Sequence, residues 1–268
     1  MKKAFRIFRI VLLALCVAVF LASAVMLVDI LVGYGKADNF YDDINKGVED
    51  ADTPDAEAGK APARLVELSK YVVELQKTYP DVVGYVNVPS LGISYPVVQA
   101  DDNDYYLDHL ISGEENSSGS IFLDYRADTD PQKAQNTVLY GHNMNDGSMF
   151  HKVEKFFTDK SLFDGAVVEY VTEDGVYIYE PWVLYRCWAG FPFGKCNFAE
   201  GESFVYFCED IIEEVTSKAF YYLNDLEYDE DSSIITFATC VNSITTKNDR
   251  YIYQAMLKEA YVNIHAED

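Results

Sequence analysis

The sequence predicts a mainly β domain, built as a closed or nearly closed barrel of about eight strands and preceded by one helix long enough to cross a membrane. Short runs rich in β-branched and aromatic residues recur between residues 83 and 257, and Gly, Pro, Asn or Asp bounds them. Strands at this spacing favour a barrel over a parallel α/β sheet. The 268 residues, 49% of them apolar and 15% aromatic, suffice for a sizeable core.

The N-terminal segment differs from the rest of the chain. Four basic residues among the first nine precede an uncharged run over 10–28, which continues to residue 32 with Asp29 as its one interruption. A run of this length can span a bilayer. Ala22-Ser23-Ala24 resembles a signal-peptide cleavage site, but the apolar run continues well past it, so we favour an uncleaved anchor over 10–32. The position of the basic residues predicts a cytoplasmic segment over 1–9 and an external C-terminal part.

A change in composition follows the apolar run. Residues 33–61 are rich in Asp, Glu, Ala and Gly without a sustained apolar period, which predicts a solvated acidic linker. The formal net charge of the chain is −23, and four of its 21 basic residues lie in the first nine positions. Such acidity excludes binding to nucleic acid or anionic lipid as the main role of the external part. Charged partners should be cationic.

Residues 62–268 are predicted to form the folded domain. It begins with a helix after Pro62, where apolar residues recur at spacings of three and four until Pro80 ends it. A long helix over 204–223 has apolar residues on one face and acidic residues on the other. The segment 173–175 is predicted to form a hairpin turn. The expected strands lie over 83–88, 95–99, 120–123, 137–140, 167–171, 176–185, 234–239 and 251–257.

Three residues near predicted strand ends indicate covalent chemistry. Cys240 ends an apolar strand, and Arg250 follows on the strand expected next. A thiolate is the nucleophilic form of cysteine, so Cys240 needs a cation or a base nearby. His142 is the best of the four histidines, because it follows an apolar strand and lies in a loop among Gly and Asn. Arg250 can donate two parallel hydrogen bonds to an oxyanion or a carbonyl, and an ion pair with Asp249 is the alternative.

The other cysteines call for structural explanations. Cys16 lies in the predicted span, as a small apolar residue or, alternatively, as an acylation site. Cys187, Cys196 and Cys208 lie in the external part, where disulfides are possible. If Cys240 stays a free thiol, at most one bridge can form among these three. Cys208 falls on the apolar face of the helix predicted over 204–223, so we expect a buried thiol there.

Several segments together resemble the sortases, and the histidine segment is similar to that of class B members. Thr236-Phe237-Ala238-Thr239-Cys240 with Arg250 behind it resembles the TLxTC signature and downstream arginine of the family. The similarity runs from about residue 83 to 257. Its further segments are Gly84-Tyr85-Val86-Asn87-Val88-Pro89, Tyr95-Pro96-Val97-Val98-Gln99, Asp102-Asn103-Asp104-Tyr105-Tyr106-Leu107, Ser120-Ile121-Phe122-Leu123-Asp124-Tyr125-Arg126, Gly141-His142-Asn143-Met144 and Asp146-Gly147-Ser148-Met149-Phe150.

The resemblance implies a sortase β-barrel over 62–268, with an N-terminal helix and a long helix before the cysteine strand. It implies a membrane-anchored cysteine transpeptidase of a Gram-positive cell that cleaves the C-terminal sorting signal of secreted proteins. Cys240 would attack the signal, His142 would protonate the departing amine, and Arg250 would hold the substrate or the oxyanion. Thr239, Asn143 and Ser243 are assigned to substrate contacts. An amine of the peptidoglycan cross-bridge in the cell wall, or a pilin lysine, would release the acyl group.

Neither a metal nor an organic cofactor is expected for this chemistry, and the aspartates over 101–104 and 124–130 do not have the spacing of an EF-hand loop. The sequence departs from the family pattern at Phe237, where leucine is usual. It also lacks the acidic residue that class B members often carry after the cysteine, because Val241-Asn242-Ser243-Ile244 follows. Three alternatives stay open: a thiol hydrolase that releases the peptide to water, a pilin-polymerising sortase, and a non-catalytic surface barrel in which Cys240 is structural.

Overall fold

The computed structural model describes residues 2–49, 59–199, 201–218, 220–241 and 248–265. Its helices are α1 (Lys2–Glu49), α2 (Ala63–Thr78), α3 (Glu154–Thr158), α4 (Lys160–Asp164) and α5 (Phe204–Thr216), with 3₁₀ turns η1 (Pro89–Leu91), η2 (Tyr105–Leu107) and η3 (Phe150–Val153). Its strands are β1 (Val82–Val88), β2 (Ile93–Val98), β3 (Ile121–Leu123), β4 (Asn136–Tyr140), β5 (Val168–Val171), β6 (Gly175–Trp188), β7 (Tyr221–Leu223), β8 (Ile234–Cys240) and β9 (Asp249–Val262).

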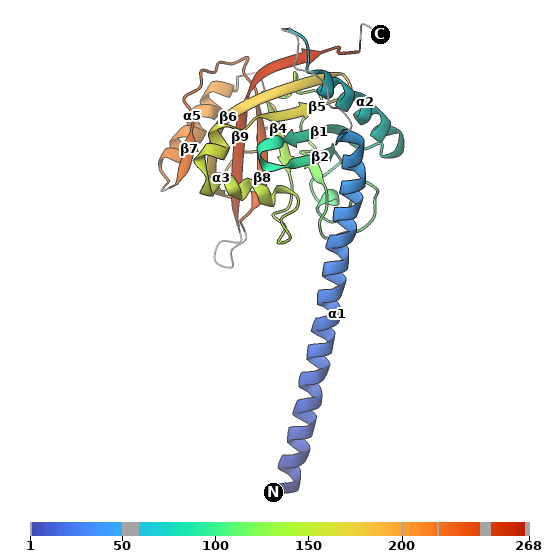
Figure 1. Cartoon of the computed structure of the whole chain (residues 1–268). Helices are drawn as coiled ribbons and strands as arrows, with labels where there is room; N and C mark the ends of the chain where they lie inside the picture. The colour runs from blue at the N-terminus through green and yellow to red at the C-terminus, as the bar shows by residue number, and fades with distance from the viewer. Residues whose placement is uncertain (1, 50–58, 200, 219, 242–247, 266–268) are drawn as a thin grey trace.

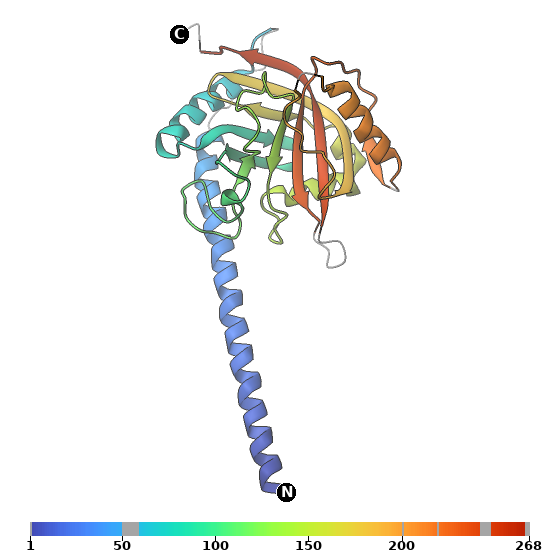
Figure 2. The same ribbon diagram turned by 180° about the vertical axis from the view of Figure 1, so that it is seen from behind.

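Eight of these strands close into a barrel, which confirms the predicted fold (Figures 1 and 2). They are ordered β5-β1-β2-β3-β4-β8-β9-β6, and the pairing of β5 with β6 closes the ring. The pairs β2–β3 and β4–β8 are parallel, and the other neighbours are antiparallel. β7 adds to β6 beyond the end of β5. The turn predicted at 173–175 joins β5 to β6 as a hairpin.

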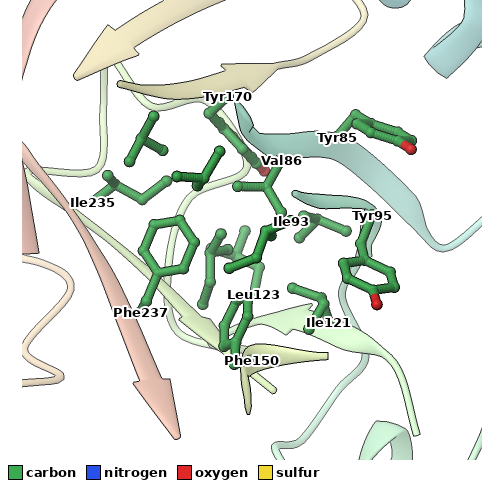
Figure 3. Close-up of a cluster of buried hydrophobic side chains, with 14 of the residues drawn as sticks. Tyr85, Val86, Ile93, Tyr95, Ile121, Leu123, Phe150, Tyr170, Ile235 and Phe237 are labelled. Carbon is green, nitrogen blue, oxygen red and sulfur yellow. The ribbon is translucent and has the colours of Figure 1, made fainter. Parts of the chain in front are cut away.

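Two apolar layers cover the two faces of β8, and this explains why its sequence is almost continuously apolar. Ile235 and Phe237 point into the barrel, where the Phe237 ring lies 5.0 Å from that of Phe150 (Figure 3). Ile234 and Ala238 face outward into a second cluster, to which α5 contributes. The fully buried aromatic rings anchor the barrel, and truncation of one to alanine costs about 3–5 kcal/mol.

A buried polar chain fixes the register of β4, β8 and β9 beneath the second layer. Thr236 donates to Asn136 Oδ1 at 2.7 Å, and Gln254 donates to Thr236 Oγ1 at 3.0 Å. The amide nitrogen of Asn136 also donates to the carbonyls of Phe193 and Lys195, at 3.0 Å each. The loop after β6 is therefore tied to the sheet that carries the strand ends at 140 and 240.

The structure corrects the prediction of a linker that starts at residue 33. α1 continues to Glu49, and Ala37, Tyr41 and Ile44 are buried against the barrel. Their spacing of three and four, flanked by Tyr34 and Val48, is a helical period that the surrounding acidic residues obscured. The described residues 59–61 precede α2, and the rest of the predicted linker, 50–58, lies outside the described residues. α2 itself starts after Pro62, as predicted.

The helix predicted over 204–223 is also corrected, because α5 ends at Thr216 and residues 221–223 form β7. The apolar residues at the end of the predicted helix face β6 as a strand, since Tyr221 and Leu223 pair with Tyr185 and Val183. Cys208 is fully buried on α5, which confirms that prediction. The cysteines at 187, 196, 208 and 240 are all free thiols.

Strands β6 and β9 are longer than predicted. β6 and β9 have 14 residues each and pair along their whole lengths. Register shifts near Tyr179 and at Pro181–Val183 interrupt the ladder, and irregularities of this kind let a strand bend around a barrel. Pro181 lies at one of them, where a missing N–H is tolerated.

Candidate active site

The register of three strands brings the predicted site residues together. β4 and β8 run in parallel with Tyr140 opposite Ala238, so His142 and Cys240 each follow two residues beyond a paired position. On the antiparallel partner β9, Arg250 is directly opposite Cys240. Because paired residues of neighbouring strands project from the same face, this arrangement places a thiol, an imidazole and a guanidinium at one end of the sheet.

A pocket of about 280 Å³ contains all three residues. His142, Cys240 and Arg250 are each partly exposed. The wall of the pocket is contributed by several loops and strand ends that are distant in the sequence. Its other lining residues are Asn103, Leu107, Phe122, Tyr140, Gly141, Ala189, Phe193, Ala238 and Thr239.

One nitrogen of the His142 ring is fixed by the chain itself. Nε2 lies 2.6 Å from the carbonyl oxygen of Leu107. A carbonyl only accepts, so Nε2 carries the proton and Nδ1 is the nitrogen left to gain or lose one. The backbone of His142 is fixed separately, because Phe150 N–H donates to its carbonyl at 2.9 Å. Gly141 permits this packing, since a Cβ there would contact the side chains of Ile121 and Phe150.

Arg250 does not form an ion pair with the side chain of Asp249, its neighbour in the sequence. Arg186 pairs with the Asp249 carboxylate at 2.7 Å. Arg250 itself donates to the backbone carbonyl of Asp249 at 3.1 Å. Among the described residues no Asp or Glu forms an ion pair with Arg250, so its remaining donors are available to a bound molecule in the pocket.

Asn143 occupies a different place from the one expected. Its side chain is buried and does not line the pocket. The amide nitrogen donates to the backbone carbonyl of Cys240 at 2.9 Å and to the Glu154 carboxylate. Its oxygen lies 2.7 Å from Nδ1 of His151. Asn143 therefore braces the backbone of the cysteine from outside the pocket.

Thr239 lines the pocket, as a substrate contact requires. Its hydroxyl oxygen is nevertheless buried and has no hydrogen-bond partner in the described part of the chain. Ser243 lies outside the described residues. Of the three residues assigned to substrate contacts, Thr239 alone is placed by the structure on the pocket wall.

A buried carboxylate lies beneath the pocket, and sequence reasoning gave it no role. Asp124 is fully buried and accepts hydrogen bonds from Arg126 at 2.6 and 2.8 Å, from Tyr140 at 3.0 Å and from Asn103 at 3.1 Å. Burial raises the pKa of Asp124, but these hydrogen bonds outweigh burial and hold the pKa below its usual value. Asn103 and Tyr140 line the pocket, so one carboxylate fixes two parts of its wall.

The chemistry of the pocket follows from its donors and its nucleophile. A thiol beside a guanidinium and an imidazole can add to a carbonyl as its thiolate. The guanidinium can stabilise the oxygen that gains charge, and the imidazole can accept and return a proton. Within the described residues, no group of three or more His, Cys, Asp or Glu side chains is arranged to hold a metal ion. Asn103, Leu107 and Tyr140 all lie in or next to the segments that carry the family resemblance, which was the available signal for them.

Comparison with known proteins shows the family to which the chain belongs. The sequence model of the sortase domain matches residues 86–258. Sortase B of Listeria monocytogenes is 33% identical over 184 residues, which cover 69% of this chain and 72% of that protein. Sortase B of Bacillus anthracis, solved in complex with AAEK1, has a TM-score of 0.67 and 27% identity, covering 86% of this chain and all of the other. For sortase B of Clostridium perfringens the TM-score is 0.59, at 27% identity, with 70% and 99% covered.

Proposed function

Because the chain belongs to the sortase family, with class B members as its relatives, we propose that it is a membrane-anchored cysteine transpeptidase that joins secreted proteins to an amine of the cell wall. The observation that supports this most directly is the row formed by Cys240 and Arg250 on paired strands, with His142 at the end of the next strand. The substrate is a secreted protein with a C-terminal sorting signal.

The first step is the attack of the Cys240 thiolate, whose proton has passed to Nδ1 of His142, on a backbone carbonyl of the sorting signal. A C–S bond forms, and the carbonyl electrons move to oxygen. Arg250 donates to this oxyanion or to the adjacent carbonyl, since its guanidinium stays protonated and has donors free of any described carboxylate. Thr239 is proposed to contact the peptide on the pocket wall.

Collapse of the tetrahedral intermediate breaks the C–N bond and leaves a thioester on Cys240. The departing amine takes its proton from Nδ1 of His142, because Nε2 is held on the Leu107 carbonyl. An incoming amine then returns its proton to His142 as it attacks the thioester, and the new amide leaves with the thiolate restored. Attack by water instead of the amine would make the protein a hydrolase.

The location we propose follows from α1. Its residues 10–32 have the length of a bilayer, about 35 Å of helix, and the part of α1 that could cross a membrane has no side chains buried in the barrel. Residues 1–9 lie in the cytoplasm and the catalytic domain is extracellular, in agreement with the basic N-terminus. Wall anchoring is the favoured role, with pilus polymerisation as the alternative if the amine comes from a pilin lysine.

Product analysis tests this proposal. The full-length protein in detergent micelles is incubated with a panel of sorting-signal peptides, with and without a peptidoglycan-like amine. Transfer product is expected with the amine, and a mass increment on Cys240 is expected when the thioester is trapped. Cys240→Ala should lose both signals, and Cys208→Ala, a buried thiol outside the pocket, should retain them. A Cys240→Ala protein with full activity, or hydrolysis alone at saturating amine, contradicts the proposal.

A further inference from the structure

We propose that the anchor helix α1 is part of the framework of the active site, with Tyr41 as a positioning residue that acts on His142 through the loop over 105–120. This inference rests on the function proposed above. It assigns to α1 a role beyond attachment, because the same helix that continues from the apolar segment also contacts the loop that holds the His142 ring (Figures 1 and 2).

Contact between α1 and this loop begins where the apolar segment ends. Asn116 donates to the carbonyl of Gly33 at 3.0 Å. Two turns further along the helix, the Tyr41 side chain is 4% exposed, and its hydroxyl lies 3.1 Å from the carbonyl of Gly119 and 3.0 Å from Ser120 Oγ. The loop is therefore fixed against α1 at two heights.

The direction of the Tyr41 hydrogen bond is determined by its neighbours. Ser120 donates its single hydroxyl proton to the carbonyl of His109 at 2.8 Å. The Gly119 carbonyl can only accept. Tyr41 is consequently the donor to the Gly119 carbonyl, and removal of its hydroxyl would leave that carbonyl without this proton. Burial raises the pKa of Tyr41, so the hydroxyl stays protonated.

Gly119 transmits this contact to Leu107. Its φ is +58°, and a Cβ built there would lie 2.6 Å from the carbonyl oxygen of Tyr106 and 2.7 Å from that of Leu107. Only glycine fits such a position. The N–H of Ser120 also donates to the Tyr106 carbonyl at 3.0 Å. The peptide group of Leu107 thus lies directly against a segment that Tyr41 holds.

The Leu107 carbonyl is in turn the partner of Nε2 in His142, at 2.6 Å. A continuous series of contacts therefore runs from Tyr41 through Gly119 and Leu107 to the imidazole. A shift of the Leu107 peptide would free the ring to rotate, and a small misplacement of a catalytic group lowers the rate of the chemical step. Leu107 is the pocket-lining residue that this loop contributes, and the walls formed by residues 122, 140 and 238–240 keep their places, so we expect substrate binding to be retained.

Two matched variants of the full-length protein in detergent micelles test the inference. Tyr41→Phe removes the hydroxyl that contacts the loop. Tyr71→Phe removes a hydroxyl from the same α1 interface, since Tyr71 on α2 donates to the carbonyl of Ile44 at 2.8 Å. Within the described residues Tyr71 makes no hydrogen bond to the loop over 105–120. Each variant keeps its ring, so the apolar packing against α1 is preserved in both.

In Tyr41→Phe we expect kcat for acyl transfer to fall about fivefold with KM unchanged, as the loss of one hydrogen bond predicts. In Tyr71→Phe kcat should stay within about twofold of the parent protein. Hydrogen exchange of the amides over 105–120 should become faster in Tyr41→Phe alone. The ring N–H proton of His142, followed by NMR with labelled histidine, should exchange faster in that variant too.

An unchanged kcat in Tyr41→Phe would overturn the inference, and so would equal losses in both variants, because these would reflect general loosening of α1. The exchange and NMR measurements need no turnover. If the parent protein transfers no acyl group, the proposed function fails, and these two measurements still decide whether Tyr41 holds the loop. Unchanged exchange over 105–120 in Tyr41→Phe would show that it does not.

Discussion

Cys187 and Cys240 stand at the two ends of one row of paired residues, with Arg250 of β9 between them. Cys187 on β6 is 3% exposed in the layer to which α5 contributes, and burial, followed by the charge of Glu214, raises the pKa of its thiol to about 12. Cys240 on β8 is partly exposed and lines the pocket. A position in this row does not by itself make a thiol reactive. The thiol must also be exposed to the pocket.

The same contrast extends to the other buried thiols. Burial raises the pKa of Cys196 and of Cys208 to about 12. All three of these thiols are buried, whereas Cys240 is partly exposed and lines the pocket.

Alkylation gives the largest expected difference. With iodoacetamide at pH 8, Cys240 should be modified at least about 10³-fold faster than Cys187 or Cys208, since a thiol with a pKa near 12 holds about one thiolate in ten thousand molecules. Peptide mapping by mass spectrometry measures the rate at each site. In denaturant all of the cysteines should react alike. Rates for Cys187 and Cys240 within tenfold of each other in the folded protein would contradict this prediction.

Arg250→Lys should lower kcat/KM about 10²-fold, because an ammonium cannot donate two parallel hydrogen bonds. Arg186→Lys is the matched control. Arg186 pairs with the Asp249 carboxylate on the neighbouring strand, and its replacement should change kcat/KM by less than about twofold. Peptide cleavage measures both. An Arg250→Lys protein with the kcat/KM of the parent would mean that Arg250 acts by its charge alone, and a comparable loss in the two variants would mean that both act through the integrity of β9.

Asp124→Asn should lower the free energy of unfolding by about 2 kcal/mol at neutral pH, because it breaks a buried, multiply hydrogen-bonded carboxylate. The folded-state pKa of Asp124 is depressed, so its stabilisation is present above the unfolded-state pKa, near 3.9, and is lost as the pH falls through the folded-state value. The variant should therefore lose less stability than the parent protein below about pH 4.

Denaturant unfolding at several pH values measures this effect. Asp164→Asn serves as the control, because Asp164 forms a half-exposed pair with Lys160 and its loss should cost under about 0.5 kcal/mol. An Asp124→Asn protein with the same acid dependence as the parent would contradict the proposed charge state.

The smallest effect concerns two threonines of β8. Thr239→Val removes a buried hydroxyl that has no partner among the described residues and should raise the free energy of unfolding by up to about 1 kcal/mol. Thr236→Val removes a hydroxyl bonded to Asn136 and Gln254 and should lower it by about 1–3 kcal/mol. Thermal unfolding measures both, and a change of the same sign in the two variants would refute the distinction.

The barrel could be predicted from the sequence because its strands carry local signals. β-branched and aromatic runs bounded by Gly, Pro, Asn and Asp identified all eight strands of the ring, with errors of a few residues at their ends. The short strand β7 is predicted as the end of a helix, because Phe220 and Leu223 continue the helical spacing of α5. Local periodicity cannot distinguish the two when a helix and a strand follow each other closely.

The prediction of a solvated linker from residue 33, where α1 in fact packs on the barrel, was wrong for a different reason. Ala37, Tyr41 and Ile44 do repeat at helical spacing, but acidic residues surround them and resemble a solvated spacer. Whether such a narrow apolar stripe is buried depends on a complementary surface, here the barrel and the loop over 105–120. The local sequence around these residues does not predict that such a surface forms.

By itself, the sequence determined which residues have the chemistry of an acyl transfer, since a thiol, an imidazole and a guanidinium are recognisable as residue types at strand ends. It also determined the barrel and the apolar helix, because hydrophobic periodicity is a local property. Only the tertiary structure decided that Asn143 braces the cysteine and that Asp124 lies beneath the pocket. Only the structure linked α1 to the ring of His142, since such contacts join residues that are far apart along the chain.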